Sequence, residues 1–154
     1  MKSVRERVTE YSKGDNLDLF WRLFRLRERT RSRLGGEALT FLLSRMARRH
    51  GGYVGRTAVI EGFLSLPHGL HGVYISRYAS IGADCRIYQN VTIGEVRGKA
   101  PQIGRNCLIG AGAVVVGDIR IGDGVKIGAG AVVCTDVPEG CTVVASPSRI
   151  LRRE

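Results

Sequence analysis

An aliphatic residue returns at every sixth position through most of the chain, and the residue four places after it is also small or aliphatic. The first positions are Ile75, Ile81, Ile87, Ile93, Ile103, Ile109, Val115, Ile121, Ile127 and Val133. The second positions are Ala79, Cys85, Val91, Cys107, Ala113, Ile119, Val125, Ala131 and Val137. Upstream, Val54, Ile60 and Leu66 keep the same step, with Ala58, Leu64 and Leu70 as their partners. Thirteen hexads therefore run from Val54 to about Pro138.

A six-residue period is too short for a helical repeat and predicts one short strand followed by a turn. Three hexads then close one triangular coil, whose inward side chains are buried only against the next coil. Both aliphatic series should point inward, which explains Cys85 and Cys107 as small core residues. We predict an all-β repeat, a parallel β-helix of about four coils.

A helical period precedes this repeat. Apolar residues recur at spacings of three and four over residues 16–33 and again over residues 37–50, as on one face of a helix. Asp15 or Asn16 is a candidate cap for the first helix, and Gly35-Gly36 is expected to stop it. We predict a basic αα-hairpin over residues 1–51, the β-helix over 52–142 and a C-terminal tail over 143–154.

The hexad step is interrupted by two insertions. Leu66 and Ile75 are nine residues apart instead of six, and Ile93 and Ile103 are ten apart. Counting hexads from Val54, these insertions leave different corners of the triangle, about one coil apart along the axis. They do not stack within one chain, so we expect a site between protomers, where one insertion meets a neighbour's wall.

Composition excludes several classes of protein. Glycine, at 21 of 154 residues, is about twice as frequent as usual, while aromatic residues are scarce. No apolar run reaches the roughly 18 residues of a membrane span, and the first residues lack the apolar segment of a signal peptide. We expect a cytoplasmic protein. The four cysteines form no C-x-x-C pair, and we expect no disulfide framework.

Positive charge is concentrated at the front of the chain. The net charge is +10, and residues 1–50 carry thirteen Lys/Arg against six Asp/Glu, compared with eleven against eight in residues 51–154. Two interpretations stay open: contact with an anionic membrane surface, or a solvated helical face that packs on a partner subunit. We expect no nucleic acid partner, because no DNA-binding motif or aromatic stacking platform is present.

Several motifs resemble a known enzyme family. The I-G-x-x-x-x series, I-G-A-G-A-V at 109–114 and 127–132, and V-V-A-S-P-S-R-I near the end are similar to hexapeptide-repeat acyltransferases. L-P-H-G-L-H-G-V-Y-I-S and I-Y-Q-N-V-T-I-G resemble the serine acetyltransferase branch. Over about residues 52–152, the resemblance implies a left-handed β-helix, a homotrimer and acetyl-CoA as acyl donor.

The first insertion carries two of the three histidines, His68 and His71. The resemblance implies that His68 is the general base. An imidazole, whose ordinary pKa is about 6.5, suits removal of a proton from an acceptor hydroxyl. His71 stands where the family commonly has a non-basic residue, and we regard it as a weaker candidate for acceptor binding.

The second insertion, G-E-V-R-G-K-A-P-Q-I-G, is the expected acceptor-binding segment. Serine acetyltransferases have an Arg-His pair where this chain has Lys99-Ala100, and an aspartate often stands where this chain has Pro67. These departures leave two acceptors open, L-serine and a sugar hydroxyl of capsule or lipopolysaccharide biosynthesis. Glu95 is a candidate for orienting His68 or binding the acceptor, or else a solvated carboxylate.

The two I-G-A-G-A-V segments are 18 residues apart, so Ala111 and Ala129 should lie one above the other at one corner. The resemblance implies that they line the pantetheine arm of CoA. It also implies that Lys126 and Arg149 lie near the phosphates, where positive charge is favourable. A backbone N–H near Gly94 or Gly110 is expected to stabilise the thioester oxyanion.

Two rival functions were compared with acetyl transfer. A metal-dependent hydratase of this fold needs three histidine ligands, and the repeat region has only His68 and His71, so we expect no metal. A non-catalytic scaffold remains an alternative, which a His68→Ala variant would distinguish.

Overall fold

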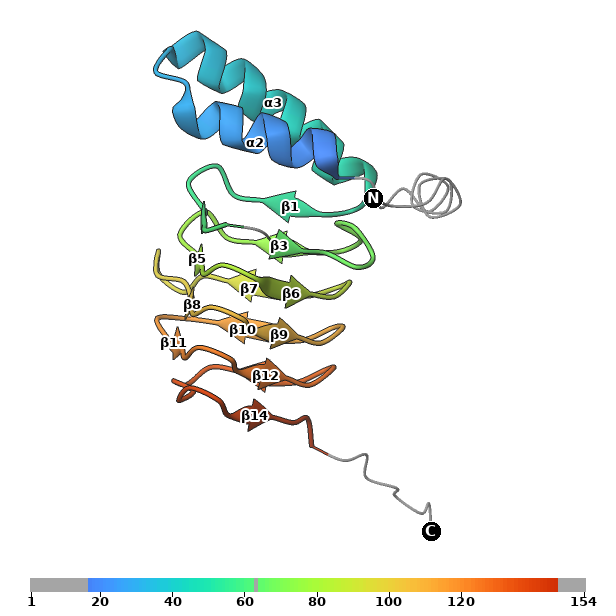
Figure 1. The fold of residues 1–154 in the computed structure, drawn as a ribbon, viewed down its shortest axis with the longest axis vertical. Coiled ribbons are helices and arrows are strands. Elements are labelled where there is room, and N and C mark those ends of the chain that lie inside the picture. The colour runs from blue at the N-terminus through green and yellow to red at the C-terminus, as the bar shows by residue number, and fades with distance from the viewer. Residues whose placement is uncertain (1–16, 63, 147–154) are drawn as a thin grey trace.

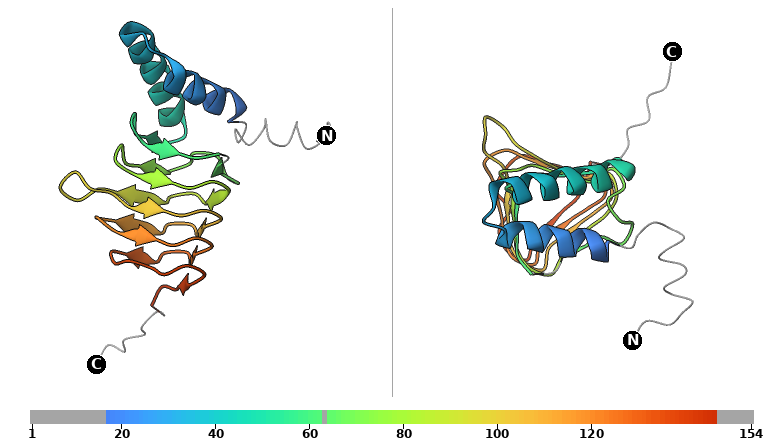
Figure 2. Two further views of the ribbon diagram at one scale, coloured as in Figure 1. Left: turned by 60° about the vertical axis from the view of Figure 1, so that its left-hand side comes forward. Right: turned by 90° about the horizontal axis from the view of Figure 1, so that it is seen from above.

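Two helices lie across one end of a stack of short strands. A computed structural model of the chain describes residues 17–62 and 64–146. Helices α2 (Asp18–Arg29) and α3 (Arg33–Arg49) cover the first coil, and the later coils follow below it (Figures 1 and 2). The strands form three parallel sheets that make the three walls of a triangular β-helix.

The three sheets take every third strand. Sheet A contains β1 (Tyr53–Val54), β4 (Tyr74–Ile75), β7 (Thr92–Gly94), β10 (Val114–Val116) and β13 (Val132–Val133). Sheet B contains β2 (Val59–Ile60), β5 (Ser80–Ile81), β8 (Gln102–Ile103) and β11 (Arg120–Ile121). Sheet C contains β3 (Leu64–Ser65), β6 (Cys85–Ile87), β9 (Leu108–Ile109), β12 (Lys126–Ile127) and β14 (Thr142–Val143). The architecture is the expected left-handed parallel β-helix of about four coils.

The strand register confirms the hexad period. Ile75 pairs with Ile93, and Val115 pairs with Val133, 18 residues apart in each case. Ile93 pairs with Val115, because the four inserted residues leave the wall and the chain then returns to register. First-position residues from Ile60 onward, apart from the half-buried Leu66, are at most 4% exposed. Aliphatic ladders inside the triangle therefore form the core.

The last coil departs from the predicted period. We expected Val137 to be the inner partner of Val133, but it forms a bridge with Ile121 and so takes a first position. Lys126 pairs with Thr142, which is 16 residues further on instead of 18. The prediction for Val137 was wrong because the final coil is two residues shorter. An aliphatic side chain suits the core at both the first and the second position of a hexad, so the sequence does not reveal the shift.

The second helix begins earlier than predicted. We expected Gly35-Gly36 to stop the first helix, but both residues lie in the first turn of α3. The chain turns instead at Thr30, and the Ser32 hydroxyl caps α3 by accepting a hydrogen bond from the Gly35 N–H at 3.2 Å. The proposed caps Asp15 and Asn16 lie outside the described residues.

The hairpin is fixed to the β-helix by packing and by hydrogen bonds. Phe20 and Phe24 are buried in the same core as the first coil. The Arg25 guanidinium donates to the carbonyl of Ile60 at 2.8 Å and to that of Gly62. None of the described helices has the length and apolar character needed to cross a membrane.

Candidate active site

His68 lies in the first insertion, at the corner where the chain passes from sheet C to sheet A. Two glycines with positive φ, Gly69 at 62° and Gly72 at 65°, turn the backbone on either side of Leu70. Leu70 is fully buried and anchors the loop, whereas His68 is exposed. The imidazole is packed near the Tyr88 ring of the next coil, with 5.9 Å between ring centroids.

The alanine positions lie at this same corner. The turns that contain Gln89, Ala111 and Ala129 all connect sheet C to sheet A, as the His68 loop does. Hydrogen bonds join successive turns: Asn90 N–H to the His71 carbonyl, Gly112 N–H to the Gln89 carbonyl, and Gly130 N–H to the Ala111 carbonyl, at 2.9 to 3.0 Å. At the usual strand spacing, Ala111 lies two coils, or about 10 Å, from the His68 turn along the axis, and Ala129 about 14 Å.

This corner offers open backbone donors. Ala111 is half-buried and Ala129 is exposed, and no described backbone group accepts a hydrogen bond from either N–H. The N–H of Gly110, in contrast, donates to the Ile127 carbonyl at 2.8 Å. Gly94 lies in β7, where it is in register with Val116 of β10. The open donors near Gly110 are therefore those of the two alanines.

The second insertion forms a tight turn at the opposite edge of sheet A. Val96 and Lys99 exchange backbone hydrogen bonds of 2.8 and 3.1 Å across Arg97 and Gly98, both of which have positive φ. This is the geometry of a two-residue hairpin turn. The turn projects from the wall between sheets A and B (Figure 2).

The polar side chains of this turn contact neighbouring coils of the same chain. The Glu95 carboxylate accepts a hydrogen bond from the hydroxyl of Ser76, which is fully buried. The Lys99 ammonium pairs with Asp118. Neither Glu95 nor Lys99 shares a corner with His68, so within one chain the two insertions remain separate.

The outer surface of sheet A, between these two corners, is apolar. Its register aligns Tyr53, Tyr74, Thr92, Val114 and Val132 in one outward row. The rings of Tyr53 and Tyr74 stack at 5.0 Å, and Val132 is 68% exposed.

Comparisons with known proteins agree with this geometry. The family described as bacterial transferase hexapeptide (six repeats) matches residues 100–135. A serine acetyltransferase of Synechococcus elongatus is 42% identical over 92 residues, which are 57% of this chain and 37% of that protein. The chain contains the hexapeptide repeat of this family and is similar over that part to serine acetyltransferases.

Solved structures extend the similarity of this hexapeptide-repeat protein. A Neisseria gonorrhoeae serine acetyltransferase in complex with serine has a TM-score of 0.72 and 35% identity, covering 85% of this chain and 55% of that one. A Brucella abortus serine acetyltransferase in complex with coenzyme A has a TM-score of 0.73 and 29% identity, covering 84% and 53%. The chain spans less than half the length of the curated relatives it matches.

The other predicted site residues lie on sheet C and near the end of α3. Lys126 is exposed on sheet C, three residues before Ala129. His71 is exposed beside the end of α3, where its ring meets that of His50 edge to face at 5.0 Å. Arg149 lies outside the described residues.

Gln89 is a candidate that the sequence reasoning missed. Its amide oxygen is buried without a hydrogen-bond partner, in the turn between the His68 loop and Ala111. Buried amide oxygens are normally satisfied, so this atom is an exception beside the proposed site. The available signal was the glutamine that follows Ile87-Tyr88, since the two later turns at this corner have alanine in its place, Ala111 and Ala129.

The cysteines of the hexapeptide-repeat core have a structural role. Cys85 and Cys107 are buried in successive coils. A hydrogen bond with the Cys107 side chain, together with burial, raises the pKa of the Cys85 thiol, so this thiol stays protonated. Within the described residues no cluster of His, Cys, Asp and Glu could hold a metal ion.

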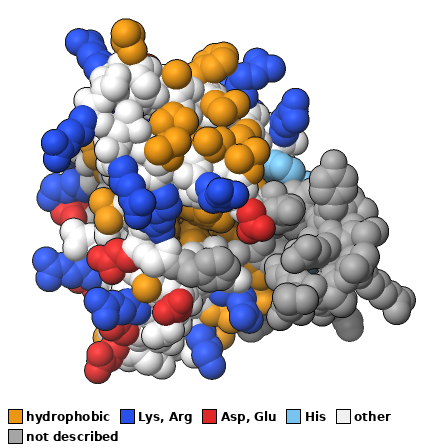
Figure 3. Space-filling view, turned by 45° about the horizontal axis from the view of Figure 1, so that its top comes forward, with side chains coloured by type: hydrophobic (Ala, Val, Ile, Leu, Met, Phe, Trp, Pro, Cys, Tyr) orange, Lys and Arg blue, Asp and Glu red, His pale blue; other side chains and the backbone are white. Residues whose placement is uncertain are grey.

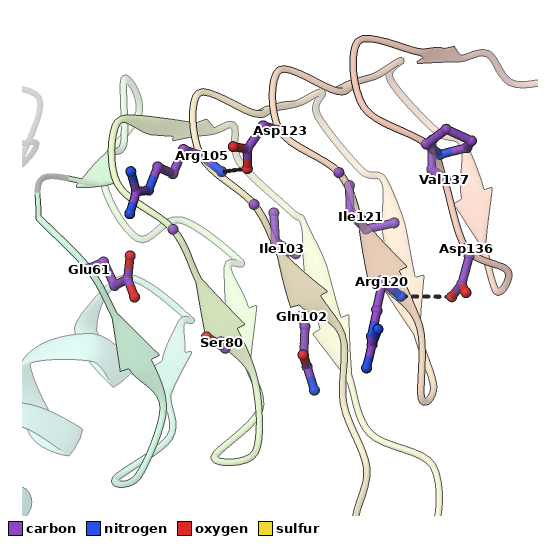
Figure 4. A pocket seen from close by; sticks show the side chains of 14 residues that line it. Glu61, Ser80, Gln102, Ile103, Arg105, Arg120, Ile121, Asp123, Asp136 and Val137 are labelled. Atoms are coloured by element: carbon purple, nitrogen blue, oxygen red, sulfur yellow. Dashed lines mark hydrogen bonds between the residues drawn. The ribbon is translucent and has the colours of Figure 1, made fainter.

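A hollow of about 620 Å³ lies on the outer surface of sheet B (Figure 4). Two of its carboxylates act locally: Asp123 accepts from the Arg105 N–H at 2.7 Å, and Asp136 from the Arg120 N–H at 2.8 Å. They satisfy backbone donors at turns, and the hollow is on a different wall from His68. The corner between sheets C and A is therefore the better candidate site.

Proposed function

We propose that the chain transfers an acetyl group from acetyl-CoA to the hydroxyl of a small molecule, with His68 as general base. One observation carries the proposal: the His68 loop and the open N–H groups of Ala111 and Ala129 lie on the same corner. A histidine at the head of a row of unpaired backbone donors fits a reactive thioester at one end of an extended ligand.

The chemistry requires one proton relay. The His68 imidazole takes the proton of the acceptor hydroxyl as the oxygen attacks the thioester carbonyl carbon. The carbon–sulfur bond then breaks, and the CoA thiolate takes the proton back from the imidazolium. The N–H of Ala111 is the donor near Gly110 that stabilises negative charge on the thioester oxygen.

The remaining part of acetyl-CoA extends along the corner, away from His68. An amide carbonyl of the pantetheine arm is suited to the N–H group of Ala129, which lies one coil beyond Ala111. Lys126 on the adjoining sheet attracts the phosphates, and Arg149 is proposed for the same role.

A homotrimer completes the site. Sheet A has an apolar outer surface and lies between the His68 corner and the corner of the 94–100 turn. If sheet A faces a threefold axis, the His68 corner of each protomer adjoins the 94–100 turn of the next, as in a closed heterologous ring. Glu95 and Lys99 of one protomer then adjoin His68 of its neighbour, where they contribute to acceptor binding.

L-Serine, giving O-acetylserine, is the first acceptor to test, because a neighbouring structure is described in complex with serine. A sugar hydroxyl is the second candidate. The 94–100 turn has one lysine and one arginine, and Lys99 is already paired with Asp118. A carboxylate substrate prefers an uncompensated cation, and among the described ion pairs none involves Arg97 of this turn. The Glu95 carboxylate is suited to accept hydrogen bonds from a neutral polyol.

A thiol-release assay tests both parts of the proposal. Acetyl-CoA is offered with L-serine, hexoses and hexosamines in turn, and free CoA is measured. Turnover with one acceptor class, lost in His68→Ala, supports the proposal and identifies the acceptor. If the parent protein and a folded His68→Ala variant release CoA at the same rate with every acceptor, the chain is a scaffold and the release is background reactivity.

A further inference from the structure

The outward surface of the helical hairpin exposes large apolar side chains. α2 and α3 bury Phe20, Phe24, Leu43 and Ala47 against each other and the first coil. Away from these buried positions, the two helices expose five large apolar residues by 44 to 84% of their area: Leu19, Leu26, Leu34, Phe41 and Leu42. Leu19 and Leu26 also line a hollow that α2 forms with Gly62 and Leu64 of the first coil. Figure 3 shows apolar side chains gathered over the hairpin with Lys and Arg around them.

The spacing of these residues places them on one face of each helix. Leu19 and Leu26 are seven residues apart on α2, and Leu34 and Phe41 are seven apart on α3, so each pair falls on one helix face. Leu42 follows Phe41 on α3. We call the five residues the hairpin patch.

Arginines surround the hairpin patch. Residues 17–50 contain nine arginines, no lysine and three carboxylates. Glu28 and Glu37 are paired with Arg25 and with Arg56 of the β-helix. Among the described residues, no ion pair involves the exposed arginines of this surface, Arg22, Arg29, Arg45, Arg48 and Arg49.

The place of the hairpin patch in the molecule and the arginines around it indicate which kind of partner can bind there. It is at the end of the β-helix, so subunits packed side by side along sheet A leave it open (Figure 1). A second copy packed face to face would bring its arginines against these arginines, which is unfavourable. An anionic surface satisfies the arginines and receives the leucines and the phenylalanine at once.

We propose that the hairpin patch docks on an anionic lipid bilayer surface. Apolar side chains on the patch enter the boundary between headgroups and acyl chains, as in interfacial amphipathic helices. The surrounding arginines interact with acidic headgroups, each adding attraction near the surface. The α3 helix, at 17 residues, is about 25 Å long, and the hairpin is inclined to the coils at this end of the molecule (Figures 1 and 2).

Vesicle flotation with the full chain tests the proposal. The protein is floated with vesicles of phosphatidylcholine alone and with vesicles that also contain phosphatidylserine, at low and high salt. We expect binding to the anionic vesicles only, weakened by salt. No binding to the anionic vesicles at low salt, or equal binding to both compositions, overturns the proposal.

Charge variants separate this surface from general basicity. The double change Arg45→Ala with Arg49→Ala should weaken partitioning into anionic vesicles about 25-fold, from about fivefold per arginine. The matched control, Arg105→Ala with Arg120→Ala, removes the same charge from exposed residues on the β-helix and should retain binding. Equal losses in both double variants contradict a specific face.

Apolar variants test insertion and self-association together. Leu34→Ser and Phe41→Ser change side chains that are 84% and 65% exposed, so little stability should be lost. We expect weaker vesicle binding with an unchanged mass by light scattering. A mass that halves in these variants shows that a second copy covers the patch and overturns the lipid proposal. Acetyl transfer is assayed separately in solution, so its failure is distinguishable from failure to bind vesicles.

Discussion

Gly110→Ala adds a single carbon atom beside the open N–H groups of Ala111 and Ala129, which are proposed to bind acetyl-CoA. A Cβ built on Gly110 would be 2.6 Å from the Ala129 nitrogen and 2.9 Å from the Ile127 carbonyl oxygen. Both contacts are backbone atoms of the next coil, which cannot rotate away as a side chain can. Relief requires the two coils to separate at this corner, and the first group displaced is the Ala129 N–H.

The magnitude follows from this overpacking. Forcing an extra carbon into a close-packed contact costs about 1 to 3 kcal/mol, which for a chain of this length lowers the Tm by about 3 to 10 °C. Weakening one hydrogen bond to acetyl-CoA should also raise its KM about fivefold. Gly36→Ala is the matched control, because a Cβ there meets nothing within 4 Å and the residue is in a helix. That change should stabilise the protein by about 0.5 to 1 kcal/mol.

The measurement is thermal unfolding of the two variants beside the parent, followed by acetyl-CoA kinetics of the folded proteins. A Gly110→Ala protein with unchanged Tm and unchanged KM would refute the reasoning, because the coils would then have room that the structure does not show. A lower Tm with unchanged KM would retain the packing argument and refute the role of the Ala129 N–H.

Three further predictions concern the proposed reaction. His68→Gln should lower kcat at least 100-fold while acetyl-CoA binding by calorimetry is retained, and His50→Gln is the control with full turnover. Ala129→Tyr should raise KM for acetyl-CoA at least tenfold by covering the corner, with little change in unfolding temperature because Ala129 is exposed; normal KM would argue against this path for the arm. Mixed trimers of His68→Ala and Glu95→Ala, each inactive alone, should regain about a quarter of the parent activity, because only one pairing in four joins an intact His68 to an intact Glu95; no recovery after subunit exchange would mean that both residues act within one chain.

The β-helix could be predicted because its determinants are local and repeated. Every coil buries a first-position residue such as Ile81 or Ile109, so the period is visible many times in the sequence. The errors occurred where a single local choice decided the outcome. Gly35-Gly36 is typical of a helix stop, but the Ser32 cap starts α3 before it. Val137 falls in the other series because the last coil is two residues shorter and still has an aliphatic residue at that place.

The candidate site was predicted unevenly for a related reason. His68 and the alanines could be identified from motifs, but their common corner depends on where each insertion returns to register. Ser76 could not be identified, because its importance comes from the Glu95 carboxylate that accepts its hydrogen bond from the next coil. Gln89 is visible only as a buried amide oxygen without a partner.

The acceptor is the least predictable part, and the geometry explains why. His68 is on one edge of sheet A and the 94–100 turn is on the other, so no single chain brings the base and the proposed acceptor-binding groups together. In the proposed trimer, acetyl-CoA contacts residues of one protomer while the acceptor also meets Glu95 of the next. Changes in the 94–100 turn can therefore alter the acceptor without altering the path of acetyl-CoA. This independence agrees with the motifs of the sequence, in which Ala111 and Ala129 resemble serine acetyltransferases while Lys99-Ala100 of the second insertion does not.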